Sequence, residues 1–306
     1  MAETFIGQHA LTDTAARQLA NATKTVPQLE SITPRWLLHL LPWVPLEAGV
    51  YRVNRVKPGS KVVVEGARRD ERVVPETFVD YDDKPREYFL SAVTTVLDIH
   101  TRVSDLYSTP HDQVSEQLRL TVEFVKERQE RELIVNPEYG FLANVAPSQR
   151  LRTRTGPPTP DDFDDLISIV WKEPAFFLAH PAAIAAFGKE CTSRGVPPPT
   201  TSLFGSPFLT WRGLPIIPSD KLDVTVGPDG IGRTNILLLR VGEKRQGVVG
   251  LYQPGLEGEH SLGLAVRFMG ISRQAIASYL ISLYSSLAIL TDDAVGLLEG
   301  VEVSRP

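Results

Sequence analysis

Residues 111–136, HDQVSEQLRLTVEFVKERQERELIVN, carry apolar side chains at the spacing of one helical face. That face holds Val114, Leu118, Val122 and Val125. Glu127 and Arg131, and likewise Arg128 and Glu132, are opposite charges four residues apart, which favours the same helix. At about 1.5 Å per residue the helix would be roughly 39 Å long, about twice the ordinary length. It is either a core element of a large domain or a spine that carries contacts to other chains.

Both ends of this helix have sequence signals. Thr109 is a candidate N-cap, and Pro110 suits the first helical position. Asp112 stands three residues after that cap, where a carboxylate can accept from free backbone amides. Asn136 and Pro137 predict the end of the helix.

Residues 51–81 place valines among charged residues around a Pro58-Gly59 turn. This pattern is typical of a two-stranded β-ribbon with a charged tip. Because such a ribbon is only marginally stable alone, it is expected to lean on another structure.

The remaining patterns predict helices early and strands late. Residues 90–107 predict a helix, Thr159 and Pro160 predict the start of another, and HPAAIAAFGKECTSRG (180–195) predicts a third. Strands are expected over SPFLTW, LPIIPSD, KLDVTV, TNILLLRV, QGVVGLYQ and LGLAVRFMG. RQAIASYLISLYSSLAIL (273–290) fits both a helical stripe and a strand face. Because no βαβ alternation is present, the fold class is α+β.

A polar, Ala- and Thr-rich stretch over residues 1–35 ends in the apolar PRWLLHLLPWVP. Its large apolar side chains are Trp36, Leu37, Leu38, Leu40, Leu41 and Trp43. This stretch is either a core helix or an arm that docks on a neighbouring chain.

Composition restricts the possible roles of the chain. It has 306 residues and a net charge of −5, so there is no broad basic field to hold nucleic acid. The one cysteine, Cys191, excludes an intrachain disulfide and lies in an apolar stretch typical of a buried thiol. No signal peptide is expected, and no apolar run reaches the about 20 residues that a membrane span needs.

Catalytic signatures are not found. The sequence has no G-x-S-x-G, H-E-x-x-H, P-loop or C-x-x-C motif. GPDGIG (227–232) lies between two strand patterns and predicts a hairpin turn rather than a phosphate loop. RLRTRTG (150–156) predicts a solvated loop, and DDFDD (161–165) a helix start rather than a cation site.

Two histidines stand near a carboxylate: His100 follows Asp98 by two residues, and His111 precedes Asp112. Such pairs can serve acid–base catalysis, but at these spacings on a predicted helix they do not face each other, so a structural role is favoured. The histidines also show no metal-ligand spacing; they are His9, His39, His100, His111, His180 and His260.

The chain resembles the shell protein of family 2A encapsulins, also called major membrane protein I in mycobacteria and the sulfur-regulated shell protein in cyanobacteria. Segments that carry the resemblance include LANATKTVPQLESITPRWLLHLLPWVPLEAGVYRVNRV, DIHTRVSDLYSTPHDQVSEQLRLTVEFVKERQERELI, AAFGKECTSRGVPPP and VRFMGISRQAIASYLISLYSSLAILTDDA. The resemblance spans roughly residues 20–295 and departs at the N-terminus, in the ribbon tip KPGSKVVVEGARRDER and in the tail VEVSRP.

The resemblance implies the HK97-type phage capsid fold and its parts. By it, residues 1–48 form an N-terminal arm, 49–89 an E-loop, and 151–244 an A-domain. Residues 90–150, with a spine helix over 110–135, and the return over 245–306 form a P-domain. The fold favours strand for much of 279–298.

The implied function is structural. The chain would self-assemble in the cytoplasm into an icosahedral T=1 nanocompartment of about sixty copies. It would enclose a cargo enzyme of sulfur metabolism, expected to be a cysteine desulfurase, and the chain itself would need no cofactor because pyridoxal phosphate would belong to the cargo. No nucleic acid or membrane partner is expected.

Two sets of residues are assigned roles in such a shell. The assembly residues of the arm are Trp36, Leu37, Leu40, Leu41 and Trp43. The possible five-fold pore loop consists of Val196, Pro197, Pro198, Pro199, Thr200 and Thr201.

Two alternatives remain beside the shell role. One is a soluble enzyme with a site around His100 and His111, joined by the acids of 161–165. The other is a peripheral membrane protein that binds through Trp36 and Trp43.

Overall fold

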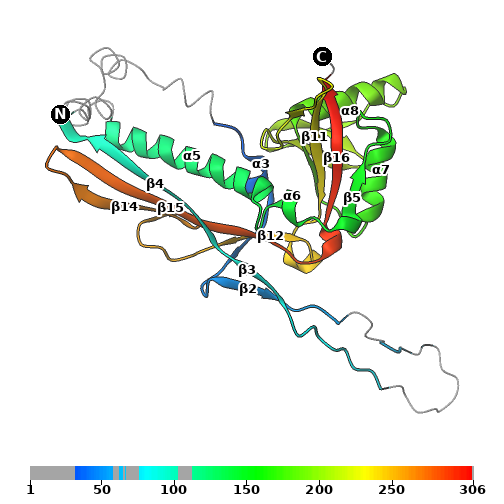
Figure 1. Cartoon of the computed structure of the whole chain (residues 1–306), viewed down its shortest axis with the longest axis horizontal. Coiled ribbons are helices and arrows are strands. Elements are labelled where there is room, and N and C mark those ends of the chain that lie inside the picture. The colour runs from blue at the N-terminus through cyan, green and yellow to red at the C-terminus, as the bar shows by residue number, and fades with distance from the viewer. Residues whose placement is uncertain (1–31, 58–61, 65, 67–75, 103–111, 305–306) are drawn as a thin grey trace.

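The computed structural model describes residues 32–57, 62–64, 66, 76–102 and 112–304. Within these ranges the chain forms three parts (Figure 1). A long sheet carries one long helix, a second sheet is covered by two helices, and a thin ribbon projects away from both.

The long helix α5 spans Gln113–Val135 and ends at Asn136, as the sequence predicts. Its N-cap is Asp112, whose side chain accepts two backbone hydrogen bonds from the first turn. The predicted cap at Thr109 and the proline at 110 lie outside the described residues. The helix begins later than the sequence indicates because the carboxylate of Asp112 takes the capping role.

The predicted apolar face of α5 lies on the long sheet. Val122 and Val125 are buried there, and Leu118 is packed at the edge of the same cluster. Of the two predicted ion pairs along the helix, Arg128–Glu132 is formed at 2.6 Å. The members of the other, Glu127 and Arg131, bind residues of other elements.

The long sheet has six strands. Its order is β1 (Trp43–Pro45), β12 (Val248–Tyr252), β15 (Ile276–Ile289), β14 (Leu264–Ile271) and β13 (Glu259–Ser261), with β4 (Ser91–His100) also paired to β15. The ambiguous stretch at 273–290 is therefore a strand.

The prediction of a helix over 90–107 is wrong, because residues 91–100 form strand β4. Side chains of β4 alternate between the core and solvent, but both faces carry apolar residues: Val93 and Leu97 pack inward while Val96 is exposed. Because apolar residues occur on both faces, the alternation that is typical of a strand cannot be seen in the hydropathy pattern of this segment. Ten consecutive antiparallel pairs with β15 decide in favour of the strand.

The second sheet has eight strands. Its order is β5 (Arg150–Arg152), β16 (Val295–Ser304), β11 (Gly232–Leu239), β6 (Phe176–Ala179), β9 (Leu214–Pro218), β8 (Ser206–Trp211) and β7 (Thr200–Leu203), with β10 (Thr225–Val226) paired to β11. Helices α7 (Pro160–Ile169) and α8 (Pro181–Ser193) pack on it around Phe163 and Phe187.

One expected part boundary differs from the structure. The resemblance placed all of 245–306 with the spine helix, but β16 lies in the eight-stranded sheet between β5 and β11. Leu297, Leu298 and Val301 of this strand are buried there. Only the turn at 290–294 separates it from β15, so the chain crosses between the sheets within a few residues.

Several local predictions are confirmed. Thr159 and Asp162 form a capping box at the start of α7, which explains DDFDD as a helix start. The segment at 227–230 is a turn between β10 and β11, closed by a hydrogen bond from Gly230 N–H to the carbonyl of Gly227. RLRTRTG instead forms the short strand β5 and a bend, with Arg150 paired to Glu299.

The ribbon is formed as predicted in the part the structure describes. Strands β2 (Val50–Val53) and β3 (Arg86–Phe89) pair only with each other, and Val56 forms a bridge to Tyr81 further out. The turn at Pro58-Gly59 lies outside the described residues.

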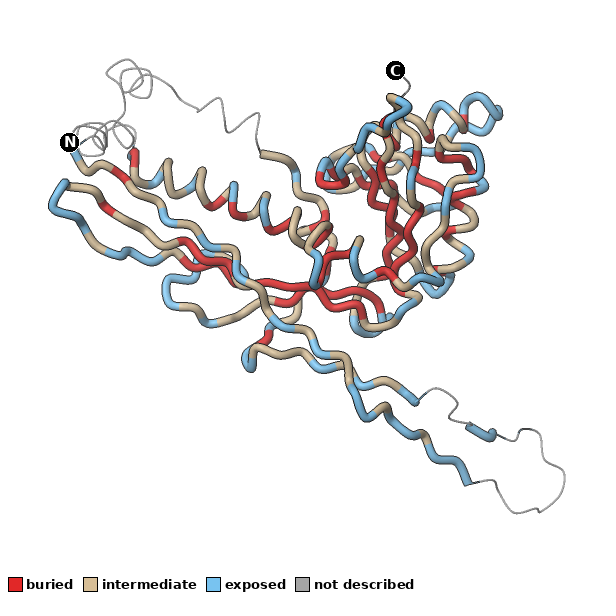
Figure 2. Tube along the Cα trace, in the orientation of Figure 1, coloured by how far each residue is buried: buried red, intermediate tan, exposed pale blue. Residues whose placement is uncertain are grey.

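The described residues also form five short helical elements: α3 (Trp36–Leu40), α6 (Phe141–Asn144), η1 (Pro147–Gln149), η2 (Glu243–Arg245) and η3 (Asp292–Ala294). Figure 2 shows that buried residues run through the eight-stranded sheet and the centre of the long sheet, whereas the described part of the ribbon is made of intermediate and exposed residues. The largest buried cluster joins α3, the end of α5 and strands of both sheets.

Alanine substitutions at Gly250 and Gly188 test how tightly each site is packed. A Cβ at Gly250 in β12 would lie 2.5 Å from the Trp43 ring, whereas one at Gly188 in α8 would meet only the Leu209 side chain at 4.0 Å. We expect Gly250→Ala to lower the free energy of unfolding by about 1–3 kcal/mol. Gly188→Ala should raise it by about 0.5–1 kcal/mol, because alanine favours the helix. Urea unfolding of both variants checks this, and two changes of the same sign would contradict it.

Candidate functional site: the arm root and the ribbon base

Residues 32–46, called the arm root, lead into the body. Leu37 and Leu41 are buried in the cluster that joins both sheets, so this segment is a core element of its own chain. Leu40 packs against the same cluster from its edge. Of the two alternatives for this apolar segment, the structure supports the core element, because Leu37 and Leu41 are buried within one chain; the assembly role of these residues stays a prediction.

The two tryptophans of the arm root have intramolecular partners as well. The Trp36 ring stacks on Phe204 at 5.6 Å and meets the edge of Phe208 at 5.3 Å. The Trp43 indole N–H donates to the carbonyl of Leu38 at 3.0 Å. Both side chains are half-buried, which leaves little of either ring for a membrane surface.

Three glutamates on one face of α5 hold the arm root by hydrogen bonds and ion pairs. Glu123, Glu127 and Glu130, called the acid row, follow at spacings of four and three residues. The backbone N–H and hydroxyl of Thr33 donate to Glu127 at 2.8–3.0 Å, and Arg35 pairs with Glu123 and Glu127. The backbone N–H of Leu37 donates to Glu130 at 3.1 Å. The acid row thus binds the backbone and the side chains of the incoming segment.

Lys221, from the loop after β9, closes the network from the other side. Its ammonium lies 2.6 Å from Glu127 Oε2 and also pairs with Asp220. Burial acts to lower the pKa of Lys221, but its bonds to Asp220 and Glu127 outweigh burial and the pKa is raised. Lys221 therefore remains a cation although its side chain is almost fully covered.

Glu130 is the most deeply buried member of the acid row, with 2 % of its surface exposed. Burial raises its pKa to about 7; the hydrogen bond from Leu37 and the charge of Lys221 oppose the rise, and the charges of Glu127 and Asp220 add to it. The carboxyl group thus titrates near neutrality.

At the same end of the long sheet, near β12 and the end of β15, the ribbon base (residues 50–57 and 82–89) is fastened to the body by side chains. Arg55 and Arg86 both pair with Asp292, at 2.9 and 2.8 Å. Tyr51 donates its hydroxyl to Glu243 at 2.7 Å, and Tyr88 donates to the carbonyl of Ile289. Burial and the bond to Glu243 raise the pKa of Tyr51 to about 12.

A groove of about 720 Å³ lies between the ribbon base and the body. It is lined on one side by residues of the ribbon and on the other by the turns at 243–246 and 290–292. The ribbon base therefore meets the body in two ways: polar contacts span the groove, and Tyr51 and Tyr88 pack against the buried cluster of Leu46, Val249, Leu251 and Ala288.

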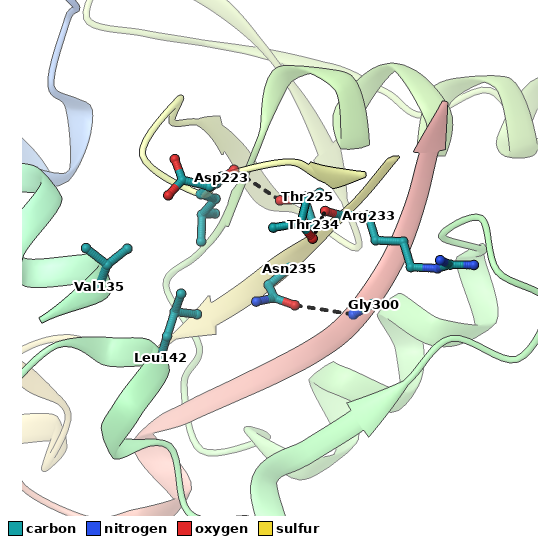
Figure 3. A pocket seen from close by; sticks show the side chains of 9 residues that line it. Val135, Leu142, Asp223, Thr225, Arg233, Thr234, Asn235 and Gly300 are labelled. Atoms are coloured by element: carbon teal, nitrogen blue, oxygen red, sulfur yellow. Dashed lines mark hydrogen bonds between the residues drawn. The ribbon is translucent and has the colours of Figure 1, made fainter. Parts of the chain in front are cut away.

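A smaller hollow of about 330 Å³ lies where the end of α5 meets the second sheet (Figure 3). Val135 and Leu142 form its apolar side, and Thr234 and Asn235 of β11 form its polar side. The side-chain Oδ1 of Asn235 accepts from the backbone N–H of Gly300, which ties β11 to β16 at this point.

The predicted pore loop joins α8 to β7. Val196 is about half exposed, and most of the segment through Thr200 is open to solvent. Pro199 lies beside Thr210 of β8 at the start of β7, which contains Thr200 and Thr201, whereas the tip of the β7–β8 hairpin, with exposed Phe204, lies at the other end of that strand.

The residues of the enzyme alternative do not converge. His100 ends strand β4, while the acids of 161–165 lie on α7, at the opposite end of the molecule (Figure 1). Asp98 accepts from the hydroxyl of Ser278, and the acids of α7 are engaged in its cap or in pairs with Arg154, Arg194 and Arg212. His111 lies outside the described residues.

Other candidate chemistry has a structural explanation. Cys191 is buried, and burial raises the pKa of its thiol to about 11, which agrees with the predicted inert thiol. Among the described residues, no three His, Cys, Asp or Glu side chains are grouped to hold a metal ion. Within the same residues, none of the helices has both the length and the apolar character to cross a bilayer.

Comparison with known proteins identifies the architecture. The family model "Type 2A encapsulin shell protein SrpI-like" matches residues 51–305. The type 2A encapsulin shell protein SrpI of Synechococcus elongatus is 68% identical over 298 residues, which are 97% of this chain and 96% of that protein. A type 2A encapsulin shell protein of Mycobacterium leprae is 62% identical and covers 97% of this chain and 95% of its own length.

Similar solved structures agree with these sequence matches. The holo-SrpI encapsulin complex from Synechococcus elongatus aligns with a TM-score of 0.82 at 65% identity, over 97% of this chain and 98% of that one. The capsid of a native GTA particle aligns with a TM-score of 0.60 at 13% identity, over 87% and 90%, and shows the shared fold alone.

Together these matches define an α+β subunit with the HK97-type capsid fold, a structural protein rather than an enzyme. The chain belongs to the type 2A encapsulin shell proteins.

Sequence reasoning missed the acid row. Its glutamates lie on a helix rich in surface charge, where they are typical of solvated i,i+4 pairs. Their partners, Thr33, Arg35 and Lys221, are about ninety residues away in the chain, so no local pattern indicates them.

Glu127 is expected to be the most costly of the acid row to neutralise. Glu127→Gln would leave Lys221 and Arg35 covered and short of a counter-charge, which should lower the free energy of unfolding by about 3 kcal/mol. Asp223→Asn, which removes the exposed partner of Arg131, should cost less than about 1 kcal/mol. Thermal unfolding at equal protein concentration measures both; equal losses would show that burial of this network contributes nothing.

Removing Asp292 should loosen the ribbon base without unfolding the body. Asp292→Ala deletes the shared partner of Arg55 and Arg86, and tryptic cleavage within the ribbon should become several-fold faster. The global unfolding free energy should change by less than about 1 kcal/mol, because these ion pairs are partly exposed. Glu87→Ala, which removes a pair within the ribbon itself, is the matched control. Equal cleavage rates for both variants would refute the anchoring role of Asp292.

Proposed function

We propose that copies of this chain assemble into a closed icosahedral nanocompartment of the T=1 class, about sixty copies, in the cytoplasm. The observation that carries the proposal is the ribbon. Within the described residues its two strands pair only with each other, and large apolar side chains on it are more than half exposed. These exposed side chains are Val56, Phe78, Tyr81 and Phe89.

Such an exposed ribbon is understandable if a neighbouring copy covers it. A two-stranded ribbon needs a further surface to be stable, and apolar side chains at this exposure mark an interaction site. The membership of the chain in a shell protein family supports the same reading.

We further propose that the shell encloses an enzyme of sulfur metabolism, a cysteine desulfurase, whose pyridoxal phosphate belongs to the cargo. This part rests on the family resemblance. The mostly exposed segment that leads into β7 is our candidate for the lining of the five-fold pore through which small molecules would pass; it consists of Val196, Pro197, Pro198, Pro199, Thr200 and Thr201.

Electron microscopy of the chain expressed alone tests the assembly proposal. We expect uniform hollow particles in the void volume of size exclusion, whereas a monodisperse monomer or dimer would overturn it. Removing residues 1–31 leaves the buried arm root intact, so this truncation separates a contribution of the arm to assembly from a loss of folding. We expect a folded subunit that assembles poorly, and normal particles would refute a role of that segment.

A further inference from the structure

We propose that the arm root is a proton-linked latch: it is held on α5 most tightly while Glu130 carries a proton, and it loosens as that proton leaves. The latch lies within one chain, so it does not rest on the proposed assembly. Its elements are a buried carboxyl group, a backbone N–H of the arm root that the carboxyl binds, and a surrounding set of fixed charges.

Glu130 is the buried one of the points at which α5 holds the arm root. The Leu37 backbone N–H that donates to Glu130 belongs to the first turn of α3, and that turn has no side-chain cap of its own. Glu130 therefore satisfies a helix-end amide that has no partner inside the helix. Leu37 itself is fully buried, so the contact can form only while the arm root is docked.

The charges that face Glu130 do not favour a second anion. From α5 comes Glu127, and from the loop after β9 come Asp220 and Lys221. The single cation, Lys221, is already bound to both of the other carboxylates. Arg35 of the arm root pairs with Glu123 and Glu127 rather than with Glu130. An ionised Glu130 would thus be a third carboxylate in a covered site.

Release of the arm root would end the burial of the Glu130 carboxyl group. Once exposed to water, the carboxyl would regain an ordinary pKa of 4.5, compared with about 7 when docked. Between these values the docked state holds a proton that the released state has lost. Each rise of one pH unit within this window should therefore weaken docking up to about tenfold, and above it the effect should level off.

His39 is the histidine of the arm root. It lies on α3 and its side chain is exposed, so we expect it to contribute little to docking. A His39→Gln variant therefore serves as the control for any pH dependence that does not come from Glu130.

Hydrogen exchange of the full-length chain tests the latch. Protection of the amides of residues 37–41 is measured from about pH 5 to about pH 8 and corrected for the intrinsic exchange rate. The wild-type chain and His39→Gln should lose at least about tenfold protection across this range, while α7 and α8 serve as internal references. Glu130→Gln keeps an acceptor for Leu37 but cannot ionise, so its protection should be independent of pH.

The outcomes separate the latch from a merely structural role. Constant protection in the wild-type chain, or an unchanged pH dependence in Glu130→Gln, would overturn the proposal. If Glu130→Gln does not fold, Asp220→Asn decides, because removing this neighbouring charge should move the midpoint of the loss to lower pH. An unmoved midpoint would also overturn the latch. Particle size recorded on the same samples reports on assembly separately.

Discussion

The pairing of β15 with its neighbours is the constraint on which the rest of the body depends. Fourteen residues of one strand pair with β4 along one edge and with β14 and then β12 along the other. This strand supplies Ile281 and Leu283 to the apolar cluster beneath α5, and Leu287 to the cluster that joins the two sheets. Without it the spine helix would have no surface to cover and the sheets no common core.

The arm root and the ribbon base are attached to this platform by different physical means. At the arm root, a covered network of carboxylates and two cations supplements buried leucines, so the attachment is strong and sensitive to any change of charge. At the ribbon base, partly exposed ion pairs span a groove, and Tyr51 and Tyr88 pack on a small buried cluster. Because the ion pairs there are partly exposed, they fix the direction of the ribbon while contributing little to stability. A rigid body whose two extensions are held at one end of the long sheet suits a shell subunit.

Much of the fold is predictable from local residue patterns. The valine face of α5, the Thr159–Asp162 capping box and the turn at 227–230 are each determined by residues a few positions apart. Strand β4 was mispredicted because both of its faces carry valines, and only its long register with β15 decides. The acid row and the placement of β16 depend on partners far away in the chain, which no local period encodes. The arm leucines were correctly recognised as apolar, but their cover within the same chain required the structure.

The position of β16 has a consequence for the order of events during synthesis. This strand lies inside the eight-stranded sheet, between β5 and β11, yet it leaves the ribosome after every other strand of that sheet. Until β16 is inserted, the edge of β11 that pairs with it remains open. The second sheet therefore cannot close on a nascent chain that has not yet emerged through Ser304, and a subunit competent for shell building exists only after nearly all of these residues have been translated.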